Sequence, residues 1–172
     1  ETVAMLRPYL IGLVVVTMIV ALAPLQWLAV RLDWPLQRVI PVLFHRIVCA
    51  LIGVHIHQRG QRDRHMPLLI VSNHVSWLDI CVVSTVAPVV FVAKQEVGTW
   101  PIVSLLARLQ RTVFIDRTRK MHTGSVTGTM AEHMNKGDAV VLFAEGTSTD
   151  GNRVLPFRSA LIGAVQQSIA QS

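Results

Sequence analysis

The sequence predicts an α/β fold, in which helices flank a largely parallel sheet and an N-terminal membrane-embedded helical segment precedes it. Short runs rich in β-branched residues alternate with helical patterns from residue 67 to residue 144, as in a chain built from βα units. Before them, residues 10–30 carry no charge over twenty-one positions. We therefore expect membrane-anchoring helices at residues 1–53 and a separate domain at residues 54–172.

The uncharged run at residues 10–30 would span roughly 30 Å as a helix, which matches the hydrocarbon core of a bilayer. Pro24 and Gln26 weaken its second half, so a helix that enters the membrane and bends is an open alternative. A secretory signal peptide is the competing interpretation. It is disfavoured because the run is longer than a usual signal core and lacks a small-x-small cleavage site.

A second apolar run at residues 39–54 is interrupted by Pro41, His45 and Arg46. These interruptions predict an interfacial or partly buried helix instead of a second span, so the N-terminal segment would form a two-helix membrane foot. A buried helix of a soluble domain is the alternative interpretation.

The charges around the first run predict its orientation. Arg31, Arg38 and Arg46 follow the run, whereas Arg7 alone precedes it. Positive residues favour the cytoplasmic side, so we expect the second domain to lie on the cytoplasmic side of the membrane. The hydrophobic content of 52% and the mean hydropathy of +0.49 agree with contact to lipid.

The net charge of +6 raises the question of a nucleic-acid partner. The basic residues do not form a long stripe interleaved with aromatic residues, and the chain has only ten Phe, Trp and Tyr in all. We therefore expect no nucleic acid, and anionic lipid headgroups are the better counter-surface.

Cysteine and histidine residues give no sign of a disulfide framework or a metal site. Cys49 and Cys81 lie far apart inside apolar segments, which is typical of small buried hydrophobic residues in a reducing compartment. His55 and His57 share one face of an edge strand expected at residues 54–60, but no third ligand follows at a usable spacing. We expect no bound metal.

The second domain is predicted to alternate strands and helices. In order, we expect a strand at 67–72, a helix at 77–87, a strand at 89–93, a helix at 100–109, a strand at 112–116, a helix at 123–135 and a strand at 139–144.

His74 and Asp79 lie just after the first of these strands and are candidate catalytic residues. Imidazole titrates near neutrality and can take a proton from a hydroxyl, while a carboxylate on its other nitrogen orients the ring. No Gly-x-Ser-x-Gly elbow supplies a serine nucleophile, so the activated hydroxyl would belong to a substrate. A hydrogen-bonded structural histidine is the alternative.

Two later strands also end in charged residues, and ligands bind at the carboxyl ends of strands in open α/β sheets. Arg117 closes Phe114-Ile115-Asp116-Arg117, and Glu145 lies in Phe143-Ala144-Glu145-Gly146-Thr147. An ion pair between Arg117 and Glu145 is the structural alternative to a binding role.

The blocks Asn73-His74-x4-Asp79, Phe114-Ile115-Asp116-Arg117 and Phe143-x-Glu145-Gly146-Thr147, in this order, resemble the glycerolipid acyltransferases typified by lysophosphatidic acid acyltransferase. The resemblance runs from about residue 54 to the C-terminus. It implies a catalytic domain that transfers a fatty acyl group from a thioester to the hydroxyl of a lysolipid, without a cofactor.

The resemblance also implies roles for the residues of these blocks. His74 would act as the base and Asp79 would orient it. Arg117, Glu145, Gly146 and Thr147 would bind the polar head of the acceptor, and the neighbouring Asn73 and Ser148 are further candidate substrate-binding residues. Backbone amides around Asn73, or at the start of the helix near residue 77, are candidate donors to the oxyanion.

The acyl donor would be a thioester of acyl carrier protein or coenzyme A. A basic cluster could receive either one, and a merely solvated face is the alternative. It consists of Arg108, Arg111, Arg117, Arg119 and Lys120.

One departure from the family pattern affects the expected acceptor. Phosphate-handling members usually continue Glu-Gly-Thr with arginine, whereas this chain has Ser148. The following residues 150–160 look similar to the branch that acylates lyso-ornithine lipid, an acceptor without phosphate. Arg153 or Arg158 could restore the missing charge, and the acceptor would then be lysophosphatidic acid.

A second departure is that the chain stops at Ser172, where family members normally continue through another strand, so we expect a C-terminally incomplete catalytic domain. Two other functions stay open. One is a catalytically inactive membrane-binding protein of the same fold, and the other is a hydrolase that uses the same dyad on water.

Overall fold

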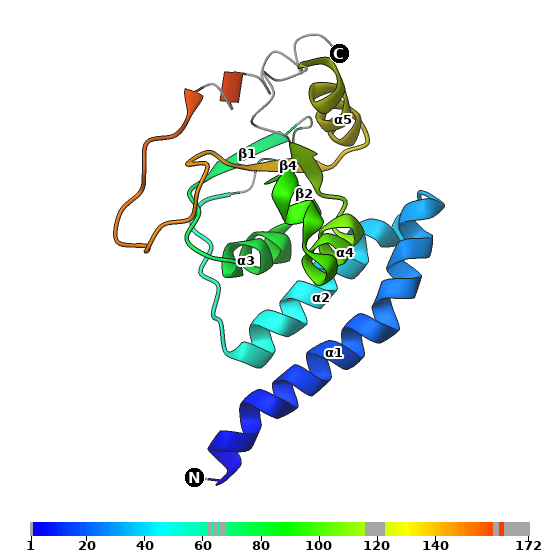
Figure 1. Ribbon diagram of the computed structural model, residues 1–172, viewed down its shortest axis with the longest axis vertical. Coiled ribbons are helices and arrows are strands. Elements are labelled where there is room, and N and C mark those ends of the chain that lie inside the picture. The colour runs from blue at the N-terminus through cyan, green and yellow to red at the C-terminus, as the bar shows by residue number, and fades with distance from the viewer. Residues whose placement is uncertain are drawn as a thin grey trace. The chain divides into compact units, whose positions relative to one another are not determined.

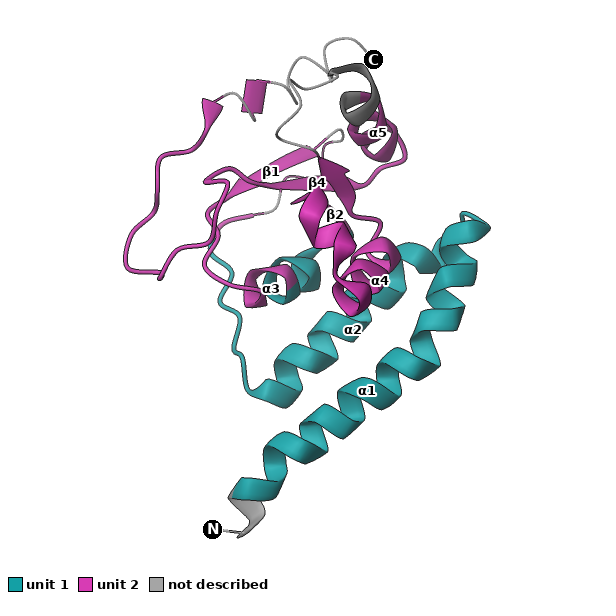
Figure 2. Cartoon of the chain, viewed as in Figure 1, with its two compact units in different colours: residues 1–59, 81–88 teal, residues 60–80, 89–172 magenta. Residues whose placement is uncertain are grey.

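A computed structural model describes residues 2–61, 63, 65, 68–115, 123–159 and 162–163. The chain divides into two compact units, shown in different colours in Figure 2. The first comprises residues 1–59 and 81–88, and the second comprises residues 60–80 and 89–172. The predicted domain boundary at residue 54 stays a prediction.

The first unit is built on two packed helices, α1 (Thr2–Arg31) and α2 (Leu36–Ile52). Within the described chain, one helical segment, Met5–Arg31, is long and apolar enough to cross a membrane. α1 continues as one helix through Pro24. The described part thus contains the apolar helix that the sequence predicts.

A short connection between α1 and α2 is held by buried amide side chains. Gln26, only 3% exposed, donates to the backbone oxygen of Gln37 at 3.0 Å, and the Gln37 side chain donates to Asp33 at 2.5 Å. Buried amides need such partners, because an unpaired polar group away from water is costly. Gln26 therefore helps to close the helical hairpin instead of ending the first helix.

The strand expected at residues 54–60 is wrong. Residues 54–59 have no regular secondary structure, and His55 and His57 are both exposed. A strand needs a neighbour for its backbone hydrogen bonds, and none of the described strands pairs with this segment.

The second unit contains a parallel sheet, shown in Figure 1. In the described residues it has four strands in the order β1-β4-β2-β3. They are β1 (Leu68–Ser72), β2 (Val89–Lys94), β3 (Val113–Ile115) and β4 (Ala139–Phe143), and each pairing is parallel. The predicted α/β class is confirmed.

Helices alternate with these strands, as the sequence predicts. They are α3 (Leu78–Val86), the 3-10 helix η1 (Gln95–Thr99), α4 (Pro101–Leu109) and α5 (Thr123–Asn135). α5 packs against β3 and β4. Its buried Met130 and Met134 join side chains of β2, β3 and β4 in the core of this unit.

A buried ion pair lies where β4 begins. The Asp138 side chain is fully buried and accepts a hydrogen bond from the Arg111 guanidinium and another from His133 Nδ1 at 3.2 Å. Arg111 itself has a positive φ of 61° and only 7% of its side chain is exposed. These contacts tie the turn before β3 to the turn between α5 and β4.

The strand order brings distant parts of the chain to one edge of the sheet. β1 and β4 are neighbours in register, with Ser72 opposite Phe143, and the Ala144 amide donates to the Ser72 carbonyl at 3.1 Å. Because both strands run in the same direction, the residues that follow them, from Asn73 and from Ala144, meet at the carboxyl edge.

Candidate active site

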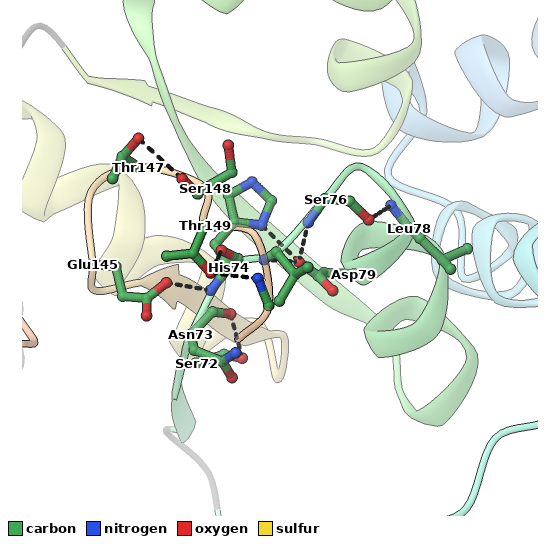
Figure 3. A network of polar contacts seen from close by, with 12 residues as sticks. Ser72, Asn73, His74, Ser76, Leu78, Asp79, Glu145, Thr147, Ser148 and Thr149 are labelled. Carbon is green, nitrogen blue, oxygen red and sulfur yellow. Dashed lines mark hydrogen bonds and ion pairs between the residues drawn. The ribbon is translucent and has the colours of Figure 1, made fainter. Parts of the chain in front are cut away.

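His74 and Asp79 are brought together where the chain passes from β1 into α3 (Figure 3). His74 Nδ1 lies 2.8 Å from Asp79 Oδ2, and about a quarter of each side chain is exposed. Ser76 caps the start of α3, because its hydroxyl accepts from the Leu78 amide at 3.2 Å and its carbonyl accepts from the Asp79 amide at 3.1 Å. The first turn of α3 thus turns the carboxylate back toward the histidine.

Asp79 also organises the backbone of this loop. Besides the imidazole, Oδ2 accepts hydrogen bonds from the amides of Val75 at 2.6 Å and Ser76 at 2.9 Å. These two amides belong to the region where the sequence suggested oxyanion donors, but here they bind the carboxylate. Among the described residues, the second ring nitrogen of His74 makes no hydrogen bond, so Nε2 is the atom able to exchange a proton with a substrate.

The face of the His74 ring rests on an aromatic side chain of β4. The rings of His74 and Phe143 are stacked, with centroids 4.1 Å apart and planes 21° apart, and the Phe143 ring also stacks with that of Phe91, whose centroid lies 5.9 Å away. Sequence reasoning gave Phe143 no role of its own. Its place in the Phe-x-Glu-Gly-Thr block was the available signal.

Glu145 is buried, with 2% of the residue exposed, and binds two backbone amides. Oε2 accepts from the His74 amide at 2.7 Å and Oε1 accepts from the Leu155 amide at 2.7 Å. Gly146 follows with a φ of 77°, a left-handed conformation that favours glycine, and its amide closes a tight turn onto the Phe143 carbonyl.

The other predicted binding residues lie beside this turn or outside the described chain. Asn73 links β1 to His74 and accepts a hydrogen bond from the Ser72 hydroxyl through its carbonyl. Thr147 and Ser148 are exposed in the loop after Glu145. Arg117 lies outside the described residues, so its predicted contacts with the acceptor or with Glu145 stay predictions.

The predicted basic cluster is wrong for one of its members. Arg111 cannot serve as a surface charge, because only 7% of its side chain is exposed and its guanidinium is paired with the buried Asp138. Arg108 is exposed, and its guanidinium lies 5.8 Å from the centroid of the Phe114 ring. Arg119 and Lys120, like Arg117, lie outside the described residues.

The two cysteines are free and buried, as expected for small apolar side chains. Burial raises the pKa of the Cys81 thiol to about 11, with a smaller contribution from Cys49. Within the part of the chain that the structure describes, no group of three His, Cys, Asp or Glu side chains is arranged to hold a metal ion.

Relatives with known names match most of this chain. The chain is 45% identical to a lyso-ornithine lipid O-acyltransferase of Rhizobium meliloti over 166 residues, which cover 96% of this chain and 57% of the relative. A protein of the same name from Brucella abortus is 46% identical over 97% of this chain and 62% of the relative. A 1-acyl-sn-glycerol-3-phosphate acyltransferase of Neisseria gonorrhoeae is 37% identical over 55% of this chain and 37% of the relative.

The chain therefore spans about three fifths of the length of its lyso-ornithine relatives from Rhizobium and Brucella. No solved structure matches it. The model of the family described as Acyltransferase matches residues 53–170, which include His74, Asp79 and Glu145 with the contacts given above. This chain belongs to the acyltransferase family.

Proposed function

We propose that the protein is a membrane-associated O-acyltransferase that transfers a fatty acyl group from a thioester to the hydroxyl of a lysolipid. The observation that carries this proposal is the contact of 2.8 Å between His74 Nδ1 and Asp79 Oδ2. This contact leaves Nε2 as the proton acceptor. It also places a carboxylate beside the ring, where it would stabilise the imidazolium that forms.

The reaction needs one base and no covalent intermediate on the protein. His74 Nε2 would take the proton of the acceptor hydroxyl while the oxygen attacks the thioester carbonyl. A C–O bond forms, the C–S bond breaks, and the proton passes from His74 to the leaving thiolate. Thioesters are already activated, so positioning of the two substrates and general base catalysis can supply the rate.

The acceptor we favour is lyso-ornithine lipid. Two relatives with 45% and 46% identity carry that name, and Ser148 offers no guanidinium for a phosphate at the position after Thr147. Lysophosphatidic acid is the second candidate, because the Neisseria relative is named for that acceptor and Arg153 and Arg158 are exposed nearby in sequence.

The lipid acceptor explains the composition of the first unit. Met5–Arg31 is suited to a membrane by length and composition, and exposed apolar side chains line it, among them Tyr9, Leu13 and Val20. We propose attachment to the inner membrane with the catalytic unit on the cytoplasmic side, where an acyl carrier protein or coenzyme A thioester would be available.

The test is acyl transfer by the full-length protein in lipid vesicles. One labelled thioester is supplied with lyso-ornithine lipid or lysophosphatidic acid, and the product is identified by mass. We expect an acylated lysolipid with the unsubstituted protein and at least a 10³-fold lower turnover with His74→Ala. Undiminished transfer by His74→Ala would refute the mechanism.

Two further outcomes would refute the proposed reaction. Free fatty acid as the only product would assign the dyad to hydrolysis. No turnover with either acceptor, in protein that is folded and bound to vesicles, would favour the inactive membrane-binding alternative.

A further inference from the structure

We infer that Glu145 is a positioning residue that holds His74 in place, instead of a contact for the polar head of the acceptor. This inference rests on the proposed acyl transfer and assigns a different task to the carboxylate of the Glu-Gly-Thr block. It follows from three features of the residue, which are its hydrogen bonds, its burial and the loop that follows it.

Both carboxylate oxygens are already engaged by the backbone. Oε2 binds the amide of His74 itself and Oε1 binds the amide of Leu155, each at 2.7 Å. Hydrogen bonds from amides to a carboxylate are short and about twice as strong as those between neutral groups. A hydroxyl or ammonium group of a lysolipid would have to compete with these contacts.

Burial leaves almost no surface for such a competitor. Glu145 is 2% exposed, whereas the following Thr147 and Ser148 are exposed. A buried carboxylate without its hydrogen-bond donors would be strongly unfavourable, so the two amides account for its presence in the interior. The acceptor can meet the exposed Thr147 and Ser148, whereas the buried Glu145 carboxylate offers it almost no accessible surface.

The loop after Glu145 binds the backbone carbonyl of the same histidine. The Thr149 amide donates to the His74 carbonyl at 2.9 Å, and the Thr149 hydroxyl lies 3.4 Å from that carbonyl. Gly151 approaches Val75 so closely that an added Cβ would lie 3.3 Å from its side chain. The amide and the carbonyl of His74 are therefore both bound by the segment from Glu145 to Leu155 (Figure 3).

The position of His74 therefore depends on the segment from Glu145 to Leu155, which also carries the exposed Thr147 and Ser148. Displacement of this loop moves the backbone of His74, and a shift of about 1 Å in a reacting group can cost about 10²-fold in rate. Loss of the Glu145 bridge should therefore lower turnover with every acceptor, whatever its head group.

The test compares Glu145→Gln with the unsubstituted full-length protein in vesicles, using lyso-ornithine lipid and lysophosphatidic acid in turn. Glutamine has one acceptor oxygen, so it leaves either the His74 or the Leu155 amide facing an NH₂ group, and the bridge is broken in both orientations. We expect kcat to fall about 10- to 100-fold by the same factor for both acceptors, with the acceptor KM changed less than about threefold.

Glu132→Gln is the matched control. Glu132 is an exposed carboxylate on α5 that pairs with Lys136 one turn later, whereas the hydrogen bonds described above for His74 and Glu145 are made with other residues. Its substitution removes the same charge from the same unit and should leave kcat and KM unchanged.

A direct contact with the acceptor would give the opposite pattern in Glu145→Gln. The acceptor KM would rise at least tenfold while kcat at saturation stayed that of the unsubstituted protein, and the inference would be overturned. Unchanged kcat together with unchanged KM would also overturn it.

If Glu145→Gln does not fold, Glu145→Asp decides by the same split. Aspartate keeps the charge, but its side chain is one CH₂ shorter and cannot bridge the His74 and Leu155 amides in the same way, so a smaller loss of kcat at constant KM is expected. An unsubstituted protein that acylates neither lipid would refute the proposed function and this inference with it. If the unsubstituted protein is active but Glu145→Gln does not lower kcat as expected, the proposed function stands and only the inference about Glu145 is refuted.

Discussion

Asp79→Asn separates the charge of the candidate dyad from its geometry. Asp79 Oδ2 accepts three hydrogen bonds, from His74 Nδ1 and from the amides of Val75 and Ser76. Asparagine has nearly the same shape as aspartate, so its amide oxygen can take the place of Oδ2 and accept from the same three donors. The ring therefore stays oriented, while the imidazolium that forms during the reaction loses its negative partner.

The expected loss follows from the Coulomb energy of that pair. Two unit charges about 4 Å apart interact by roughly 4 kcal/mol at an effective dielectric constant of about 20. The side chains are 24% and 27% exposed, so screening by water reduces this further, and we take about half, ~2 kcal/mol. At about 1.4 kcal/mol per tenfold in rate, kcat should fall about 30-fold.

The assay is kcat for acyl transfer at saturating thioester and lysolipid, with thermal unfolding as a check on the fold. Asp79→Ala should lose more than Asp79→Asn, because it also leaves two amides and the ring without their acceptor. An Asp79→Asn variant within twofold of the unsubstituted kcat would refute the electrostatic role. Equal losses in both variants would refute the separation of charge from orientation.

Three further predictions concern other parts of the chain. Ser148→Arg should raise the ratio of kcat/KM for lysophosphatidic acid over lyso-ornithine lipid about tenfold, measured in competition, and an unchanged ratio would contradict the role given to this position. Asp138→Asn should lower the free energy of unfolding in urea by roughly 3–5 kcal/mol, because the buried Arg111 charge loses its partner, and an unchanged midpoint would contradict it. Raising the pKa of the Cys81 thiol from 9.0 to about 11 lowers its thiolate fraction at pH 8 about 100-fold, so iodoacetamide should modify Cys81 of the folded unsubstituted protein about 100-fold more slowly than Cys81 of the unfolded protein. The rate is measured on the peptide that contains Cys81 and should still rise with pH above 9, and equal rates would contradict the burial of this thiol.

Most of the secondary structure of the second unit is predictable from local pattern. The helix expected at residues 123–135 is α5 (Thr123–Asn135), and the strand expected at 89–93 is β2 (Val89–Lys94). β2 is a short run of mostly β-branched apolar residues, which favours a buried strand, and α5 ends just before a turn at Lys136 and Gly137. The 3-10 helix Gln95–Thr99 was not predicted, since one short turn leaves no periodic signal.

The order of the strands is not predictable in the same way. β4 lies between β1 and β2, and both β2 and β4 are buried apolar runs. A strand buried on both faces has no alternation of polar and apolar residues, so its sequence does not indicate which strands lie next to it. The segment at residues 54–59 shows the reverse error, because it has the alternation of a strand but no partner among the described strands.

In the candidate site, too, contacts within one local turn are predictable from the sequence, whereas contacts between distant segments are not. Contact between His74 and Asp79 is predictable from their spacing, because both belong to one local turn into a helix. The task of Glu145 is not, since its partners are backbone amides, and every residue except proline has one. Burial of Arg111 is likewise set by Asp138, which reaches it only through the pairing of distant elements.

The register between β1 and β4 connects the stability of the sheet to the candidate chemistry. With Ser72 opposite Phe143, the ring of Phe143 faces His74 and the carboxylate of Glu145 reaches the His74 amide. A slip by one residue would turn Phe143 to the other face of the sheet and carry Glu145 away from that amide, because side chains alternate along a strand. Val140 and Leu142 of β4 resist such a slip, since it would turn them away from Met130 and Met134, with which they form the core. Packing in the middle of the sheet therefore holds the histidine at its edge, although none of those core side chains needs to touch a substrate.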